Sequence, residues 1–218
     1  MSIRVTMACV AIAIAAATPS TAANIALSNT GVNNSGQVLA SGASDTHYSL
    51  YYYDGGTNLP SPQVATSANG YPIAPSGPWL GDNSTSAWIG PVGDSALDGD
   101  YGWYVYHTTF NVTAAPSSAS ITGRFSADDF AYLALNDSFS WYANDFYNFY
   151  DFSLNSGFVQ GENTLDFWVY NYGGPTGLRV EMTGSQAPEP ASWALMLGGF
   201  GAIGGALRSR RKVTARFA

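Results

Sequence analysis

Two uncharged segments frame a long middle part in which apolar and polar residues alternate. Residues 5–17 and 191–207 contain no charged side chain. Between them, the clearest alternation runs from Tyr101 to Val112, where large apolar residues recur at every second position. A period of two is typical of β-strands, and Gly, Asn, Asp and Ser gather between such runs as turn residues. The middle of the chain is therefore predicted to be all-β.

Shorter runs with the same pattern predict further strands. Short strands joined by hairpin turns are typical of an antiparallel β-sandwich. We therefore predict a two-sheet antiparallel β-sandwich, with no helix longer than about two turns between Asn24 and Gln186. The further strands cover residues 47–53, 120–126, 130–135, 152–154, 158–159, 165–171 and 178–182. The predicted core consists of Val105 or Tyr106, Phe110, Ile121, Phe125, Leu133, Leu135, Leu165, Phe167, Val169 and Val180.

The first uncharged segment has the features of a secretory signal peptide. Arg4 precedes it, and the small residues Thr-Ala-Ala at 21–23 offer a cleavage site. We expect residues 1–23 to be removed, which leaves residues 24–187 as one exported domain that is long enough to bury a core. Cys9 is the only cysteine and lies inside the signal peptide. The mature chain is therefore predicted to have no disulfide and no cysteine metal ligand.

The second uncharged segment follows Pro188-Glu189-Pro190 and precedes a basic cluster. Proline disfavours helix, so the tripeptide is predicted to be extended and exposed. As a helix, residues 191–207 would extend roughly 25 Å, slightly less than the hydrocarbon core of a membrane. The basic end and residues 213–218 are expected on the cytoplasmic side. The basic cluster consists of Arg208, Arg210, Arg211 and Lys212.

This order of features resembles the PEP-CTERM sorting tail, which would occupy residues 188–212. The resemblance implies that an exosortase-type membrane transpeptidase recognises the Pro-Glu-Pro tripeptide, and that helix 191–207 anchors the chain in the membrane before processing. It also implies an exported protein of the cell surface or extracellular matrix, with exopolysaccharide as a partner. The alternative interpretation is an ordinary single-span tail anchor.

The domain is strongly acidic. Residues 24–187 contain two basic side chains, Arg124 and Arg179, and fourteen acidic ones, which gives a net charge of −12. Such a surface repels phosphate backbones, so nucleic acid is excluded as a partner. Carboxylates close in sequence are candidate ligands for a structural Ca²⁺ ion, although a role in solubility is the alternative. The candidate ligands are Asp94, Asp98 and Asp100 in one loop, and Asp128 and Asp129 in another.

A second resemblance concerns residues 88–183, which look like a galactose-binding-like jelly roll. The resemblance rests on a strand with the pattern F-x-V, an A-D-D corner, a strand that ends on Asn136, and a G-x-N-x-L hairpin. Asp137 departs from the pattern, which usually has glycine there. The resemblance implies a jelly-roll sandwich of the kind that accompanies many glycoside hydrolases. The matching segments are 106–112, 126–129, 132–137 and 161–165.

Aromatic and polar residues together suggest that the domain binds carbohydrate. Flat aromatic rings stack on the apolar faces of sugar rings, while Asn and Asp supply hydrogen bonds to hydroxyl groups. Residues 141–150 hold six aromatic side chains and are predicted to form an aromatic loop. Trp88 and Trp168 are interpreted as packing residues. The candidate binding residues are Trp79, Trp103, Trp141, Tyr142, Asn144 and Asp145.

No catalytic residue is predicted. The chain has neither a Gly-x-Ser-x-Gly elbow nor a His-Glu-x-x-His motif, and its only histidines are His47 and His107. No pair of carboxylates has the placement that a glycosidase requires. We therefore expect a non-enzyme without a cofactor other than the candidate Ca²⁺. The alternatives to a carbohydrate-binding module are a structural matrix or coat protein and an accessory module for glycan degradation.

Overall fold

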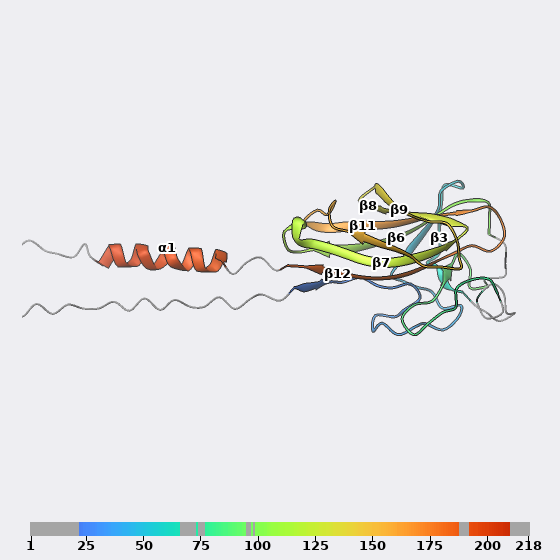
Figure 1. Ribbon diagram of the computed structural model, residues 1–218, viewed down its shortest axis with the longest axis horizontal. Coiled ribbons are helices and arrows are strands. Elements are labelled where there is room, and N and C mark those ends of the chain that lie inside the picture. The colour runs from blue at the N-terminus through green and yellow to red at the C-terminus, as the bar shows by residue number, and fades with distance from the viewer. Residues whose placement is uncertain are drawn as a thin grey trace, which may run out of the picture. The chain divides into compact units, whose positions relative to one another are not determined.

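Antiparallel strands dominate the domain. The computed structural model describes residues 22–65, 73, 77–94, 97, 99–187 and 192–209, and residues 22–188 make up one compact unit (Figure 1). The described strands form two sheets of six strands each, and every pairing within them is antiparallel. The predicted two-sheet antiparallel sandwich is therefore confirmed, while the finer relationship to galactose-binding-like jelly rolls stays a prediction.

We name each sheet after one of its long strands. The β6 sheet has the order β3-β2-β6-β11-β8-β9 and contains β3 (Thr57–Leu59), β2 (Ser49–Tyr52), β6 (Gly102–Val112), β11 (Gly161–Asn171), β8 (Phe130–Leu135) and β9 (Ser138–Ala143). The β7 sheet has the order β10-β7-β12-β5-β4 and contains β10 (Tyr150–Leu154), β7 (Ala119–Asp128), β12 (Gly177–Gln186), β5 (Ile89–Gly90) and β4 (Gln63–Val64), with β1 (Ala23–Ile25) also paired to β12.

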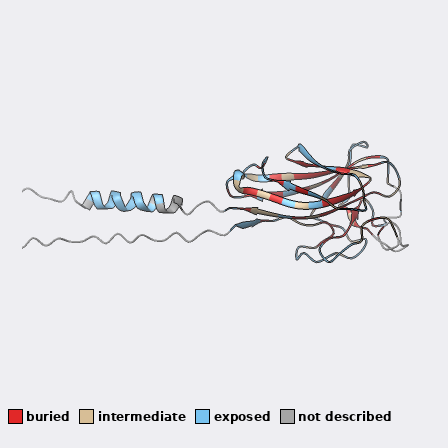
Figure 2. Cartoon of the chain, in the orientation of Figure 1, coloured by how far each residue is buried: buried red, intermediate tan, exposed pale blue. Residues whose placement is uncertain are grey.

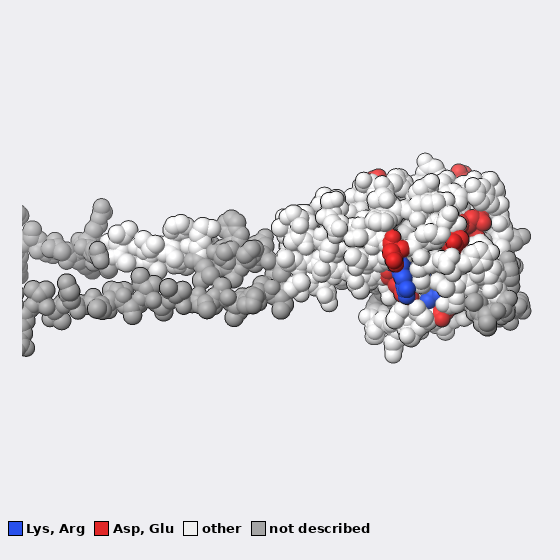
Figure 3. Space-filling view, viewed as in Figure 1, with Lys and Arg blue, Asp and Glu red and all other residues white. Residues whose placement is uncertain are grey.

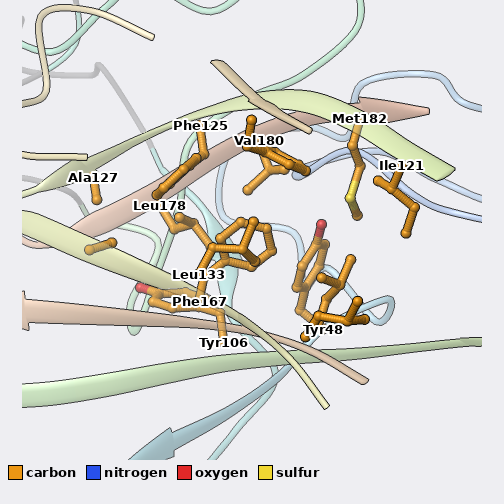
Figure 4. Packing of buried hydrophobic residues seen from close by; sticks show 14 of the residues in the cluster. Tyr48, Tyr106, Ile121, Phe125, Ala127, Leu133, Phe167, Leu178, Val180 and Met182 are labelled. Carbon is orange, nitrogen blue, oxygen red and sulfur yellow. The ribbon is translucent and has the colours of Figure 1, made fainter. Parts of the chain in front are cut away.

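The core lies between the two sheets. Along β6, every second side chain from Tyr104 to Val112 is buried. Buried positions alternate with less buried ones along the long strands in view (Figure 2). Rings and aliphatic groups from both sheets interdigitate there; for example, the rings of Phe125 and Phe167 lie 5.6 Å apart (Figure 4). Every residue of the predicted core is buried. The alternation in the sequence thus separates the two faces of the long strands correctly, and the structure shows that Tyr106 rather than Val105 belongs to the core between the sheets.

The turn between β8 and β9 explains a departure from the jelly-roll pattern. Asn136 and Asp137 both have positive φ angles, 48° and 64°, and connect the two strands as a two-residue hairpin. A type I′ turn requires positive φ at both central residues, and Asn and Asp tolerate this conformation better than most other side chains. Aspartate can therefore take the place of the usual glycine at this turn.

Both ends of the domain lie at the same edge of the β7 sheet. Ala23 of β1 pairs with Gln186 at the end of β12. The side chain of Gln186 accepts hydrogen bonds from the backbone N–H groups of Thr113 and Ala114, at 2.8 and 3.0 Å. These contacts tie the last strand of the domain to the segment that follows β6.

The described helical segments are few. Within the described part of the domain, the only helix is the single 3₁₀ turn Pro116–Ser118, as expected from the absence of helical periodicity. The tail contains one α-helix, α1 (Ser192–Ser209), at the place where a helix was predicted. Among the residues that the structure describes, no helix is long and apolar enough to cross a membrane. Residues 1–21, most of the predicted signal peptide, lie outside the described residues.

Candidate binding face

Aromatic side chains cover the outer side of the β6 sheet. Because paired residues on neighbouring antiparallel strands point to the same side, the register defines rows of side chains that cross the sheet. One row runs across five strands and contains four aromatic residues and one valine. In order, its members are Tyr51, Val105, Trp168, Tyr132 and Tyr142.

A second aromatic row lies beside the first. Trp103 pairs with Tyr170, which pairs with Phe130, and the ring centroids of the two successive pairs are 4.8 and 5.3 Å apart. Tyr53 extends this row, because its backbone N–H donates to the carbonyl oxygen of Trp103 at 2.9 Å. We call the outer side of the β6 sheet the aromatic face. Its members are Tyr51, Tyr53, Trp103, Phe130, Tyr132, Phe139, Tyr142, Trp168 and Tyr170.

The aromatic face contains a hollow of about 360 Å³ that is lined by Trp103, Tyr132, Phe139 and Trp168. Phe139 reaches this place because a register shift between Leu133 and Ala134 pairs it with the small side chain of Ala134. Its ring lies 5.7 Å from that of Trp168. We call this feature the aromatic hollow.

Many of these rings are open to solvent. Tyr132 is 39% exposed, and Tyr53, Phe139 and Tyr142 are more exposed still, while Trp103 and Trp168 are half-buried. Large apolar side chains that are exposed one by one are ordinary on protein surfaces, but a continuous patch of them marks a site of interaction. The aromatic face is therefore the best candidate for a binding surface within the described residues.

A polar row borders the aromatic rows. Ser49, His107 and Asp166 occupy paired positions on β2, β6 and β11. Nδ1 of His107 lies 2.6 Å from Oδ1 of Asp166, and the histidine side chain is 39% exposed. Burial raises the pKa of Asp166, and the hydrogen bond with His107 opposes this shift. Because Nδ1 is engaged by the carboxylate, Nε2 is the ring nitrogen that can reach a ligand on this face.

The arginines of the domain lie on the β7 sheet instead. Nε and Nη2 of Arg124 donate to Oε2 of Glu181 at 2.9 and 2.7 Å. The guanidinium of Arg179 is buried; it donates to Ser86 Oγ at 2.9 Å and to the carbonyl oxygen of Gly81. Figure 3 shows basic atoms close to acidic ones on the face in view. The aromatic face carries no arginine or lysine among the described residues.

Glu181 is the centre of this charged network. Burial opposes ionisation of its carboxyl, but hydrogen bonds from Asn83 and Ser86, together with the charge of Arg124, outweigh burial and lower its pKa to about 2. The network holds residues 80–86 against β12, because Asn83 and Ser86 donate to Glu181 at 2.6 and 2.8 Å. The arginines therefore fasten a loop to the sheet.

The structure brings two of the predicted carbohydrate-binding residues together and separates two others. Trp103 and Tyr142 both lie on the aromatic face. Trp141 pairs with the buried Leu133, so it points to the other side of β9 and lines a separate cavity of about 190 Å³. Trp79 is fully buried, stacks on Trp88 at 4.6 Å and donates from Nε1 to Asp128 Oδ2 at 2.6 Å. The prediction of Trp79 as a binding residue is therefore wrong.

The aromatic loop also differs from its prediction. Residues 141–143 belong to β9, and the loop itself begins at Asn144. Oδ1 of Asp145 accepts hydrogen bonds from the backbone N–H groups of Tyr147 and Asn148, while the hydroxyl group of Tyr150 lies within hydrogen-bond distance of both Asn144 Oδ1 and Asp145 Oδ2. An aspartate that bonds to N–H groups two and three residues ahead stabilises a turn. The side chains of Asn144 and Asp145 are thus engaged in hydrogen bonds within the loop and stabilise its conformation.

Sequence reasoning missed three residues of the aromatic hollow. Trp168 was interpreted as a packing residue, and Tyr132 and Phe139 were not selected. A usable signal was present in the alternation: Trp168 and Tyr132 occupy the strand positions between buried ones. An aromatic residue at an outward position of a strand is exposed unless another element covers it.

The candidate Ca²⁺ ligands fall in two places. Asp94 and Asp100 line one cavity of about 380 Å³, and Asp98 lies outside the described residues. Asp128 accepts a hydrogen bond from the indole N–H of Trp79, and Asp129 Oδ2 accepts one from the backbone N–H of Tyr172 at 2.6 Å. Across the described residues, no three His, Cys, Asp or Glu side chains gather as a metal site would require. Calcium binding in the Asp94–Asp100 loop stays a prediction.

Comparison with known families identifies the tail. A family model described as the PEP-CTERM protein-sorting motif matches residues 186–212. The match includes the Pro-Glu-Pro tripeptide at 188–190 and the basic residues up to Lys212, most of which lie outside the described residues. It supports an exported, exosortase-targeted surface protein. No curated protein matches the chain.

Proposed function

We propose that this chain is a non-catalytic cell-surface protein that is exported, sorted by an exosortase and able to bind carbohydrate through its aromatic face. The observation that carries the proposal is the aromatic hollow, where four rings open to the surface on one side of a sheet. Rings in such a position offer flat apolar surfaces to the C–H faces of sugar rings. Tyrosine hydroxyl groups and the border at His107 supply polar contacts beside them.

The matched variants Trp168→Ala and Trp141→Ala test this proposal. Trp168 is half-buried and lines the hollow, whereas Trp141 is exposed and lies on the other side of β9. We expect Trp168→Ala to reduce retention on immobilised polysaccharides at least about tenfold, because removal of a central aromatic contact is among the costliest changes at a binding surface. Trp141→Ala should be retained like the unchanged protein.

The measurement is a pull-down of the full chain, in a detergent without sugar groups, on a panel of insoluble polysaccharides. Circular dichroism of both variants establishes that they remain folded. Equal retention of the two variants would show that the aromatic face is not the binding surface. No retention of the unchanged protein on any polysaccharide would favour a structural coat protein instead.

Processing of the tail has its own test. We expect the mature protein extracted from the cell surface to end near residue 188, because the sorting motif begins beside it. Replacement of Pro188 and Pro190 by alanine should leave the tail in place, since the Pro-Glu-Pro tripeptide is the segment expected to be recognised by the transpeptidase. Mass spectrometry of the extracted protein measures the difference. A mature form that still ends at Ala218, in cells that possess an exosortase, would mean that the tail is only an anchor.

A further inference from the structure

We propose that the aromatic face binds a neutral, linear polysaccharide chain that lies across the strands, and that it rejects polyuronates and single sugars. This inference rests on the carbohydrate-binding function proposed above and specifies its ligand class. Three properties of the face carry it: the direction and length of the aromatic rows, the distribution of charge, and the kind of side chain that is exposed.

The length of the rows fits a chain rather than a single sugar. The row from Tyr51 to Tyr142 crosses β2, β6, β11, β8 and β9. Neighbouring strands lie about 4.8 Å apart, so the row extends roughly 19 Å. That is the length of a short oligosaccharide. The second row, with Trp103, Tyr170 and Phe130, runs parallel to the first and doubles the width of the platform.

The charges around the face select against an acidic polymer. Asp166 lies in the bordering row, and Asp54 accepts a hydrogen bond from the backbone N–H of Trp103 at 2.6 Å. The two arginines of the domain are engaged with Glu181 and with loop 80–86 on the other sheet. A uronic acid polymer would thus meet carboxylates without a lysine or arginine among the described residues of this face. Repulsion between like charges disfavours such a partner.

The kind of side chain that is exposed also favours a glycan over a second protein as the ligand of the aromatic face. Within the two aromatic rows the only aliphatic side chain is Val105, which is 7% exposed. Protein–protein interfaces are enriched in aromatic residues, methionine and arginine. Neither methionine nor arginine occurs in these two rows. Here rings stand beside a histidine with an available Nε2, a combination of flat apolar surface and hydrogen-bonding edge that suits sugar rings and their hydroxyl groups.

The experiment compares neutral polymers with an acidic polymer in native affinity electrophoresis of the full chain. The neutral linear probe is hydroxyethylcellulose, with linear mannan and xylan as further neutral probes, and the acidic probe is polygalacturonate. We expect at least one neutral polymer to retard the unchanged protein at least about tenfold more strongly than polygalacturonate does. Retardation should be lost in Trp168→Ala and kept in Trp141→Ala. Added free glucose or galactose, at the same concentration of sugar units, should not release the protein.

Each other outcome overturns a defined part of the proposal. Equal retardation by polygalacturonate, or release by a free monosaccharide, would overturn the inference about ligand class while carbohydrate binding stands. Absence of retardation by every polymer would remove the carbohydrate function itself. Concentration-dependent self-association that Trp168→Ala abolishes, measured by analytical ultracentrifugation, would show that a second copy of the chain occupies the face and would overturn both.

Discussion

Replacing Phe125 by alanine is expected to destabilise the folded domain by about 3–5 kcal/mol, the cost of removing a large aromatic side chain from a packed core. Phe125 is fully buried on β7, and its ring lies 5.9 Å from that of Phe152 and 5.6 Å from that of Phe167 across the sandwich. Its removal leaves a cavity between the two sheets that neighbouring side chains fill only in part. Urea unfolding of the full chain, followed by circular dichroism, measures the change.

Phe139→Ala is the matched control for this prediction. It removes the same side chain from an outward position of β9, where Phe139 is 55% exposed. Little apolar surface is lost from the interior, so the free energy of unfolding should change by less than about 1 kcal/mol. If Phe125→Ala unfolded at the same urea concentration as Phe139→Ala, the packing between the sheets would be assigned wrongly. Phe139→Ala should instead weaken retention on polysaccharide, because Phe139 lines the aromatic hollow.

Replacing Asp128 by asparagine is expected to raise the stability of the domain by up to about 4 kcal/mol near pH 8 and to change it little near pH 4. Burial is the main reason that the pKa of Asp128 rises to about 7, and the neighbouring Asp129 adds to the rise, while the hydrogen bond from Trp79 opposes it. Asparagine keeps an oxygen that accepts the N–H of Trp79 but carries no charge. The variant therefore avoids ionisation of a buried group.

The direction of the pH dependence follows from the raised pKa. The folded protein holds the proton of Asp128 up to about pH 7, whereas the unfolded chain releases it near pH 4. The stability gained from the protonated group is complete below about pH 4 and is lost as the pH rises towards 7. The pKa of Glu181 is lowered to about 2, so its contribution to stability is instead lost as the pH falls below about 4. Its contribution is the same in both proteins and cancels in the comparison.

Thermal unfolding between about pH 4 and pH 8 tests this prediction. The difference between Asp128→Asn and the unchanged protein should grow steadily with pH. Asp151→Asn is the control, because Asp151 is an exposed carboxylate in the same sheet and its replacement should give a curve parallel to that of the unchanged protein. A constant difference between Asp128→Asn and the unchanged protein would mean that Asp128 is ionised in the fold at every pH examined.

The sequence was most informative where local geometry decides the outcome. Alternation along residues 101–112 correctly predicted a strand with two distinct faces, because successive side chains of a strand point in opposite directions whatever its neighbours are. It left open whether Val105 or Tyr106 points inward. The hairpin at Asn136 and Asp137 was equally predictable, since few residues accept positive φ. These features depend on a few consecutive residues.

Prediction of the candidate binding face requires information that is not local in the sequence. Trp141 and Tyr142 look alike in the sequence, and the register between β8 and β9 decides which of them lies on the aromatic face. Trp79 was misassigned because its burial depends on a distant residue: Arg179 of β12 holds the loop that follows Trp79 through the carbonyl of Gly81. No pattern within ten residues of Trp79 contains this contact. The errors in predicting this candidate site therefore come from strand pairing and loop placement rather than from the assignment of the strands themselves.

The pairing of β1 with the end of β12 has a consequence for the accessibility of the aromatic face. The chain leaves the domain at Gln186, beside Thr113. Trp103 lies at the other end of β6, roughly 30 Å away along the strand. The exit point of the chain and the ring of Trp103 therefore lie at opposite ends of one strand. A ligand bound at the proposed face would approach the domain at the end that is far from the point where the chain leaves it, so attachment and binding would not compete for the same surface of the domain.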